Sequence, residues 1–197
     1  GLAKDKFDII SSQFSIHYYF KDEETLDSYI TNILQNIKQG GVFIGTCYDG
    51  KLIFDRLNKP EPFEYNTKNK VFSVEKKYDI TNFDYNGTSE NMLGQEINVY
   101  MESIGQNIPE YLVNFDYFVD IMDKYGFEPY KPKMKKKYNK VIENDIGSFL
   151  DIIKELETIQ KEDDDLKRRY KSSLDILKNP ALMKLSSMNN YFIFQKK

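Results

Sequence analysis

The chain has 197 residues, enough to bury a hydrophobic core as one domain, and its net charge of −3 excludes a generic polycation. One cysteine, Cys47, and one histidine, His17, exclude a disulfide within the chain and a Cys/His zinc site. We find no signal-peptide pattern and no long apolar run, so we expect a reducing, intracellular location and no membrane span.

The first predicted elements form a strand–helix–strand unit. A short apolar run indicates a strand over Lys6–Ser11. Apolar side chains then recur at helical spacing within Asp22–Lys38, with acidic residues at the start and Gly40-Gly41 as the stop. Val42–Cys47 is the second strand, and two strands joined by one helix favour a parallel pair.

The middle of the chain predicts a short helix and then an antiparallel insertion. The helix covers Leu52–Leu57, and Pro60 ends it. Between residues 60 and 108, β-branched and aromatic residues favour strands, best at Val71–Val74 and Glu96–Tyr100. We expect this insertion to lie over the carboxyl edge of the main sheet.

The last part of the chain predicts further helices and a final strand. A helix begins after its cap, Asn114, and stops at Gly126. The apolar spacing of Ile146–Leu156 marks a longer helix, and Leu174–Leu177 continues a helical pattern. The apolar segment Tyr191–Gln195 predicts a strand inside a sheet.

Two charged segments interrupt this region. Lys131–Lys140 holds six lysines in ten residues. This run has two interpretations: a solvated edge strand guarded by lysine, which we favour, or a path for RNA phosphates. Glu162–Arg169 is acidic and then basic, which predicts an exposed helix or loop.

A candidate site follows the first predicted strand. Gln13, His17, Tyr18 and Tyr19 come directly after it, and open α/β sheets bind ligands at the carboxyl ends of their strands. The alternative is structural, because a single histidine is commonly a hydrogen-bonding core residue and adjacent tyrosines commonly pack. From these residues alone the structural interpretation is favoured.

The same stretch resembles a known family. Phe7–Phe20 and Gly40–Thr46 are similar to the messenger-RNA cap guanine-N7 methyltransferases, whose pattern is a strand ending in Q-F, then H-Y-x-F, a helix and P-G-G-x-F-I-G-T. A second match lies at Pro109–Phe115, and a weaker third match at Tyr191–Phe194. The order and rough spacing agree over nearly the whole chain.

The resemblance implies an α/β fold of the class I, Rossmann-like S-adenosylmethionine methyltransferases, with a mostly parallel sheet and an antiparallel insertion. The glycine-rich turn and the acidic residue that bind the donor in this fold have no match in the chain. We therefore expect residues 1–197 to be the carboxyl portion of one methyltransferase domain, without its amino-terminal strands. Its core would be residues 6–57 and 110–197, and its cap-side insertion residues 60–108.

The resemblance also implies site residues. Gln13 and Tyr18 match positions that contact the donor, S-adenosylmethionine, and His17, Glu110 and Tyr191 match positions that contact the cap guanine. Methylation of guanine N7 needs neither a general base nor a metal, so we expect a site that works by positioning, with no catalytic residue.

One position departs from the family pattern, which has G-T-x-P followed by Asp or Asn. Tyr48 replaces the proline, and the sequence assigns it no role. Cys47 is expected to be a small apolar residue at a strand end and not an activated thiol.

The sequence and the resemblance thus predict part of a messenger-RNA cap guanine-N7 methyltransferase. We expect the parent protein to be a viral capping enzyme and residues 1–197 to be inactive by themselves. The first alternative is a non-catalytic subunit that binds cap or stabilises a catalytic partner, and the second is a small-molecule methyltransferase. Expected partners are 5′-capped RNA, the rest of the capping enzyme and a stimulatory subunit. The expected location is a virion or cytoplasmic viral factory, or otherwise the nucleus.

Overall fold

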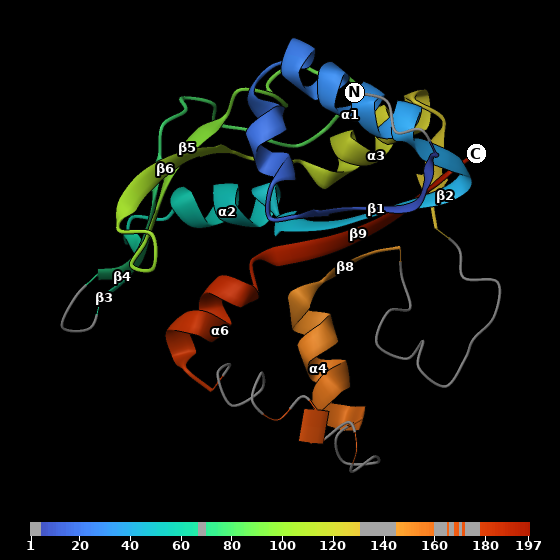
Figure 1. The fold of residues 1–197 in the computed structure, drawn as a ribbon. Coiled ribbons are helices and arrows are strands. Elements are labelled where there is room, and N and C mark those ends of the chain that lie inside the picture. Colours follow the sequence, from blue (N-terminus) through green and yellow to red (C-terminus); the bar gives the residue numbers. More distant parts are fainter. Residues whose placement is uncertain are drawn as a thin grey trace.

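The structure is a computed structural model that describes residues 5–66, 70–130, 145–159, 165, 168, 169, 171 and 178–197. Two β-sheets organise these residues (Figure 1). The first contains β1 (Phe7–Gln13), β2 (Ile37–Tyr48), β7 (Phe127–Pro129), β8 (Ile146–Ser148) and β9 (Asn189–Lys196). The second contains β3 (Phe63–Asn66), β4 (Lys70–Lys76), β5 (Glu96–Met101) and β6 (Gln106–Tyr111).

The first sheet has the order β1-β2-β9-β7, and β8 also pairs with β9. β1 and β2 are parallel, which confirms the predicted strand–helix–strand unit. β9 is antiparallel to β2, β7 and β8, so these three strands and β1 all run in one direction. The sheet is therefore mostly parallel in strand direction, but β1–β2 is its one parallel ladder in the described residues, because β9 separates β2 from β7 and β8.

Helices α1 (Glu23–Asn36) and α3 (Phe115–Lys124) lie on one side of this sheet, and α4 (Phe149–Ile159) and α6 (Pro180–Ser186) lie on the other (Figure 1). The core beneath α1 and α3 is aromatic. Phe118 of α3 packs its ring 5.1 Å from the rings of both Phe192 and Phe194, and Phe43 lies 5.1 Å from Phe192. Among the described residues, no helix is long and apolar enough to span a membrane.

The boundary between α1 and β2 differs from the prediction. Asp22 caps the helix by accepting a hydrogen bond from Thr25 N at 2.8 Å, as the acidic start indicated. The helix ends at Asn36 and not at Lys38, because Ile37 is extended and begins β2. Gly40, with φ of +71°, lies within β2 beside a shift in the β1–β2 register, so it allows a strand irregularity and does not stop the helix.

The second sheet confirms the predicted antiparallel strands, since all three of its ladders are antiparallel. Its last strand, β6, runs to Tyr111 and carries Glu110. The short helix α2 (Gly50–Leu57) precedes this sheet and begins two residues before the predicted Leu52. The boundaries of the predicted domain and insertion remain predictions.

The predicted helix over Ile146–Leu156 is wrong at its start, because residues 146–148 form β8 and the helix begins at Phe149. The predicted final strand is confirmed and is longer, Asn189–Lys196. The lysine run and the predicted helix at 174–177 lie outside the described residues, as do residues 162–164, 166 and 167 of the second charged segment.

Candidate functional site

A sharp turn joins β1 to the 3-10 helix η1 (Ile16–Lys21). Phe14 has φ of +49°, a left-handed conformation that non-glycine residues adopt infrequently, and its N–H donates to Thr46 O at 2.8 Å. The turn places His17 and Tyr18 of η1 beside the carboxyl ends of β1 and β2, where the sequence predicted a site.

His17 and Glu110 form a buried pair between η1 and β6. Their exposed fractions are 4% and 8%, and Nε2 of His17 lies 3.6 Å from Oε1 of Glu110. Neither ring nitrogen of His17 nor Oε2 of Glu110 has a hydrogen-bond partner among the described residues. Because buried polar groups normally have partners, these three atoms have hydrogen-bonding capacity that the described residues leave unused.

Burial favours the neutral form of each side chain of this pair. It lowers the pKa of His17 to about 4 and raises the pKa of Glu110 to about 7. At neutral pH the imidazole is therefore uncharged, and the carboxyl group is divided between its protonated and ionised forms.

Tyr18 lies at the rim of this pair. Its ring centroid is 4.3 Å from that of His17, and 40% of the residue is exposed. Burial and then the charge of Glu110 raise its pKa, so its hydroxyl lies within electrostatic reach of that carboxylate. An exposed ring beside a buried acceptor gives a flat ligand both a surface for stacking and a group for hydrogen bonding.

Gln13 and Tyr191 lie on either side of Thr46. The Thr46 hydroxyl donates to Gln13 Oε1 at 2.8 Å, and Tyr191 faces Thr46 across the β2–β9 ladder. Tyr191 is 8% exposed and packs over Gly147, where a Cβ atom would lie 2.4 Å from the tyrosine oxygen. Gly147 is thus required by the position of the Tyr191 ring.

Tyr48 lies beside the candidate site, and the sequence assigned it no role. Burial, then the charges of Glu110 and Tyr18, raise the pKa of its hydroxyl, which places it near both residues. It lies two residues beyond Thr46 on the same face of β2. That spacing is the signal in the sequence, and the departure of Tyr48 from the family pattern obscures it. Tyr48 links the Gln13–Tyr191 side of the site to the His17–Glu110 side.

Asn189, at the start of β9, is the neighbour of Tyr48 in the sheet and was not singled out by the sequence. It faces Tyr48 across the β2–β9 ladder and is 5% exposed. Its side-chain nitrogen donates to Leu185 O and Ser186 O, whereas Oδ1 has no partner among the described residues. No pattern in the sequence distinguishes Asn189 from other polar residues at strand starts.

The arrangement suits recognition and positioning of a flat, polar ring. It offers hydrogen-bonding atoms from His17 and Glu110 and the exposed aromatic ring of Tyr18 beside them. The described residues contain no group of His, Cys, Asp and Glu side chains that could hold a metal ion. Burial raises the pKa of Cys47, so its thiol is not an activated nucleophile.

Comparison with known proteins identifies the family. A model of the mRNA (guanine-N(7))-methyltransferase domain matches residues 3–179, which is most of the chain. The chain belongs to the mRNA (guanine-N7)-methyltransferase family. The family and the methyltransferase fold indicated by the sequence are thus confirmed.

Individual relatives include fungal and viral proteins. The mRNA cap guanine-N(7) methyltransferase of Eremothecium gossypii is 30% identical over 148 residues, which cover 73% of this chain and 33% of the relative. A probable mRNA-capping enzyme of Acanthamoeba polyphaga mimivirus is 29% identical over 218 residues, covering 99% of this chain and 18% of the relative. The solved CcbJ methyltransferase from Streptomyces caelestis is similar, with TM-score 0.48 and 12% identity, over 100% of this chain and 59% of that chain. The chain thus spans a third or less of these two curated relatives.

Proposed function

We propose that this chain is the substrate-binding portion of an mRNA cap guanine-N7 methyltransferase, which transfers a methyl group from S-adenosylmethionine to N7 of the cap guanine. The observation that carries the proposal is the buried His17–Glu110 pair. Three of its polar atoms have no hydrogen-bond partner among the described residues, and the chain belongs to a family of cap methyltransferases. A subunit that only stabilises a catalytic partner would have no need of such a pair, and the match to a methyltransferase family favours the enzyme over a subunit that only binds cap.

Glu110 recognises the guanine in this proposal. A carboxylate accepts hydrogen bonds from N1–H and from the 2-amino group of guanine, and adenine cannot offer this pair of donors. His17, neutral at physiological pH, adds a ring face and two nitrogens for hydrogen bonding. Tyr18 and Tyr191 contribute aromatic surface against the base, since stacking on an aromatic side chain contributes about 1–3 kcal/mol per base.

The transfer itself requires no acid or base from the protein. The N7 lone pair forms the new bond to the methyl carbon as the bond from carbon to sulfur breaks, and that electron pair leaves with the sulfur. The guanine ring gains a positive charge while the sulfonium becomes a neutral thioether. The carboxylate of Glu110 stabilises this developing charge, and alignment of the reactants supplies much of the remaining rate.

Gln13 and Tyr18 contribute to the donor side of the site. One N–H of the Gln13 amide donates to Ser11 Oγ at 2.9 Å and its oxygen accepts from Thr46, so the second N–H remains for a ligand. The exposed ring of Tyr18 supplies apolar surface nearby. These groups fit part of S-adenosylmethionine and not all of it, because the chain has no glycine-rich turn.

The remaining donor contacts would come from the rest of the capping enzyme, beside β1. β1 is the outer strand of its sheet in the described residues, and Phe7 and Ile9 on it are 51% and 61% exposed. Such an apolar edge is a place for a further strand and a covering helix. Capped RNA and a stimulatory subunit are the other proposed partners. The proposed location is a virion or a cytoplasmic viral factory, or otherwise the nucleus.

A substrate-swap experiment tests the role of Glu110 in the full-length protein. Hydrogen bonds to charged groups are worth about 1.5–3 kcal/mol, so Glu110→Ala should lower kcat/KM for capped RNA by about tenfold to a hundredfold or more. Glu110→Gln should not restore it, because the amide presents a donor where an acceptor is needed. Inosine-capped RNA lacks the 2-amino group, so the wild type should use it less well than the guanosine cap.

The variants then form a double-mutant cycle between protein and base. Glu110→Ala should no longer distinguish inosine from guanosine caps, and its affinity for S-adenosylmethionine should match that of the wild type. Equal discrimination in wild type and Glu110→Ala would remove Glu110 from the site. Methyl transfer by the wild type to a position other than N7 of the cap would overturn the proposed function.

A further inference from the structure

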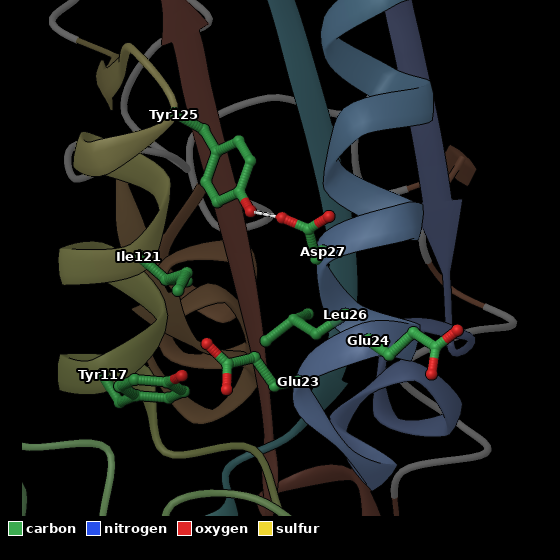
Figure 2. A pocket seen from close by; sticks show the side chains of 7 residues that line it. All are labelled: Glu23, Glu24, Leu26, Asp27, Tyr117, Ile121 and Tyr125. Carbon is green, nitrogen blue, oxygen red and sulfur yellow. Dashed lines mark hydrogen bonds between the residues drawn. The ribbon is translucent and has the colours of Figure 1, made fainter.

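A groove lies between α1 and α3, outside the candidate substrate site (Figure 2). Its volume is about 440 Å³, which lies in the range of small-ligand sites, and no proposed donor- or cap-contacting residue lines it. Three carboxylates and two tyrosines supply its polar lining: Glu23, Glu24, Asp27, Tyr117 and Tyr125.

The carboxylates of this groove have no cationic partner among the described residues. Lys124, on α3, pairs instead with Asp120 at 2.8 Å. Glu23 and Asp27 both point toward α3, whereas Glu24 projects from the other side of the first turn (Figure 2). The amino end of α1 favours acidic side chains at Glu23 and Glu24, but Asp27 lies four residues beyond Glu23, where two like charges repel each other.

Tyr117 is an independent indication of a ligand. The residue is 3% exposed, and its hydroxyl has no hydrogen-bond partner in the part of the chain that the structure describes. Figure 2 shows this hydroxyl directed into the groove toward Glu23. The hydroxyl oxygen is not among the fully buried polar atoms of the described residues, so it opens on the groove, where a ligand that donates a hydrogen bond reaches it.

The lining selects the chemical class of that ligand. A phosphate would be repelled by the carboxylates, and the described carboxylates do not converge closely enough to hold a metal ion. Leu26 and Ile121 provide apolar walls for an aliphatic stem, while the carboxylates and the tyrosine rings attract its charged end. A lysine or arginine side chain has both parts.

We propose that this groove binds a lysine or arginine side chain from a basic segment of a partner protein. The proposal is independent of methyl transfer, because it uses none of the residues assigned to the cap or the donor. It makes the outer surface of α1 and α3 a docking site for protein and not for RNA.

The test uses the full-length protein and a fluorescein-labelled peptide of four Gly-Lys repeats, with fluorescence anisotropy at low and moderate salt. A second peptide carries acetyl-lysine at each lysine, which keeps the length and removes the charge. The groove variants are the double substitution Glu23→Gln/Asp27→Asn and the single substitution Tyr117→Phe. The control Glu90→Gln/Glu102→Gln removes two exposed carboxylates elsewhere and so matches the change in net charge.

We expect the double groove variant to weaken lysine-peptide binding at least tenfold and Tyr117→Phe to weaken it about threefold. The control should change it less than twofold, and the acetylated peptide should not bind. Thermal unfolding of the double variant should change little, because the lost Glu23–Asp27 repulsion offsets the lost charge at the amino end of α1 and the weaker acceptor left for the Tyr125 hydroxyl. Equal binding by groove and control variants, binding of the acetylated peptide, or no binding by the wild type would each overturn the proposal.

Discussion

Burial moves the pKa values of His17 and Glu110 in opposite directions, and this sets the charge of the candidate site. The pKa of His17 falls to about 4, so the imidazole stays neutral throughout the physiological range. The pKa of Glu110 rises to about 7, so its ionisation is the change that occurs near neutrality. The proposed recognition of guanine by the Glu110 carboxylate is therefore expected to depend on pH.

The efficiency of methyl transfer should rise with pH through about 7. The proposed contact needs the carboxylate, and the pKa of Glu110 in the free protein is raised to about 7 by burial. Below this value kcat/KM for capped RNA should fall about tenfold per pH unit, because that parameter reports ionisations of the free enzyme. The measurement is kcat/KM for cap between about pH 5.5 and pH 8.5.

Glu110→Gln is the control for this profile, because the amide does not titrate. Its lower efficiency should be flat across the same range, and the wild-type affinity for S-adenosylmethionine should not follow the Glu110 profile. A wild-type inflection unchanged by Glu110→Gln would assign the ionisation to another group.

The sequence could name the site residues but could not describe their surroundings. Gln13, His17, Tyr18, Glu110 and Tyr191 were named through resemblance to a family, and their functional roles remain predictions. The buried contact between His17 and Glu110 depends on how η1 packs against β6, which no local pattern encodes. The spacing of Tyr48 from Thr46 placed it on the same face of β2, but its proximity to Glu110 follows from tertiary packing.

At the scale of elements, Asp49 joins α2 to β9. One carboxylate oxygen caps α2 by accepting from Lys51 N at 2.9 Å and Leu52 N at 3.1 Å. The other accepts from Asn190 Nδ2 at 2.7 Å. A single side chain therefore fixes both the start of a helix and the start of the reversed strand beside Tyr191.

Asp49→Ala should lower the free energy of unfolding by about 2–3 kcal/mol, through loss of a helix cap and an unpaired buried amide at Asn190. Asp49→Asn should lie between, because its oxygen can still cap α2 while its nitrogen faces another donor. Asp22→Ala serves as the comparison, because Asp22 caps α1 through one backbone hydrogen bond. This substitution should lower the free energy of unfolding by about 1 kcal/mol. Urea unfolding measures all three, and equal losses for Asp49→Ala and Asp22→Ala would show that Asn190 contributes nothing.

Element boundaries show where sequence patterns stop being informative. Ile37 fits the helical spacing of α1 but is fully buried in β2, so its apolar character satisfies either element. Ile146 fits the spacing of α4 in the same way, yet β8 forms because Gly147 packs against the Tyr191 ring. In contrast, α1, α3 and β9 were predictable because their periodicity agrees with their burial.

At the scale of the whole molecule, the exposed edge of the first sheet dominates the behaviour expected of the chain by itself. Ile9 on β1 is 61% exposed, and Val42, Ile44 and Ile193 on the same face are only partly covered. Unpaired strand edges with apolar side chains associate with each other.

The 197-residue chain alone should therefore self-associate, bind S-adenosylmethionine poorly and fail to methylate capped RNA. Ile9→Lys should reduce the association measured by analytical ultracentrifugation, because charge on an edge strand opposes pairing. Ile104→Lys is the matched control, since Ile104 is 52% exposed but lies away from this sheet. Micromolar binding of S-adenosylmethionine by this chain in calorimetry would show that the donor site is misplaced.

The reversed strand β9 also fixes when the sheet can form during protein synthesis. β9 lies between β2 and β7, and its residues, 189–196, are made after the other strands of its sheet in the described residues. Until they leave the ribosome, β2 has no neighbour on that side, and Phe43 and Phe118 lack the rings of Phe192 and Phe194. Helices and strands made earlier must wait for the arrival of β9, so a nascent chain stopped before residue 189 exposes its aromatic core to chaperones and proteases.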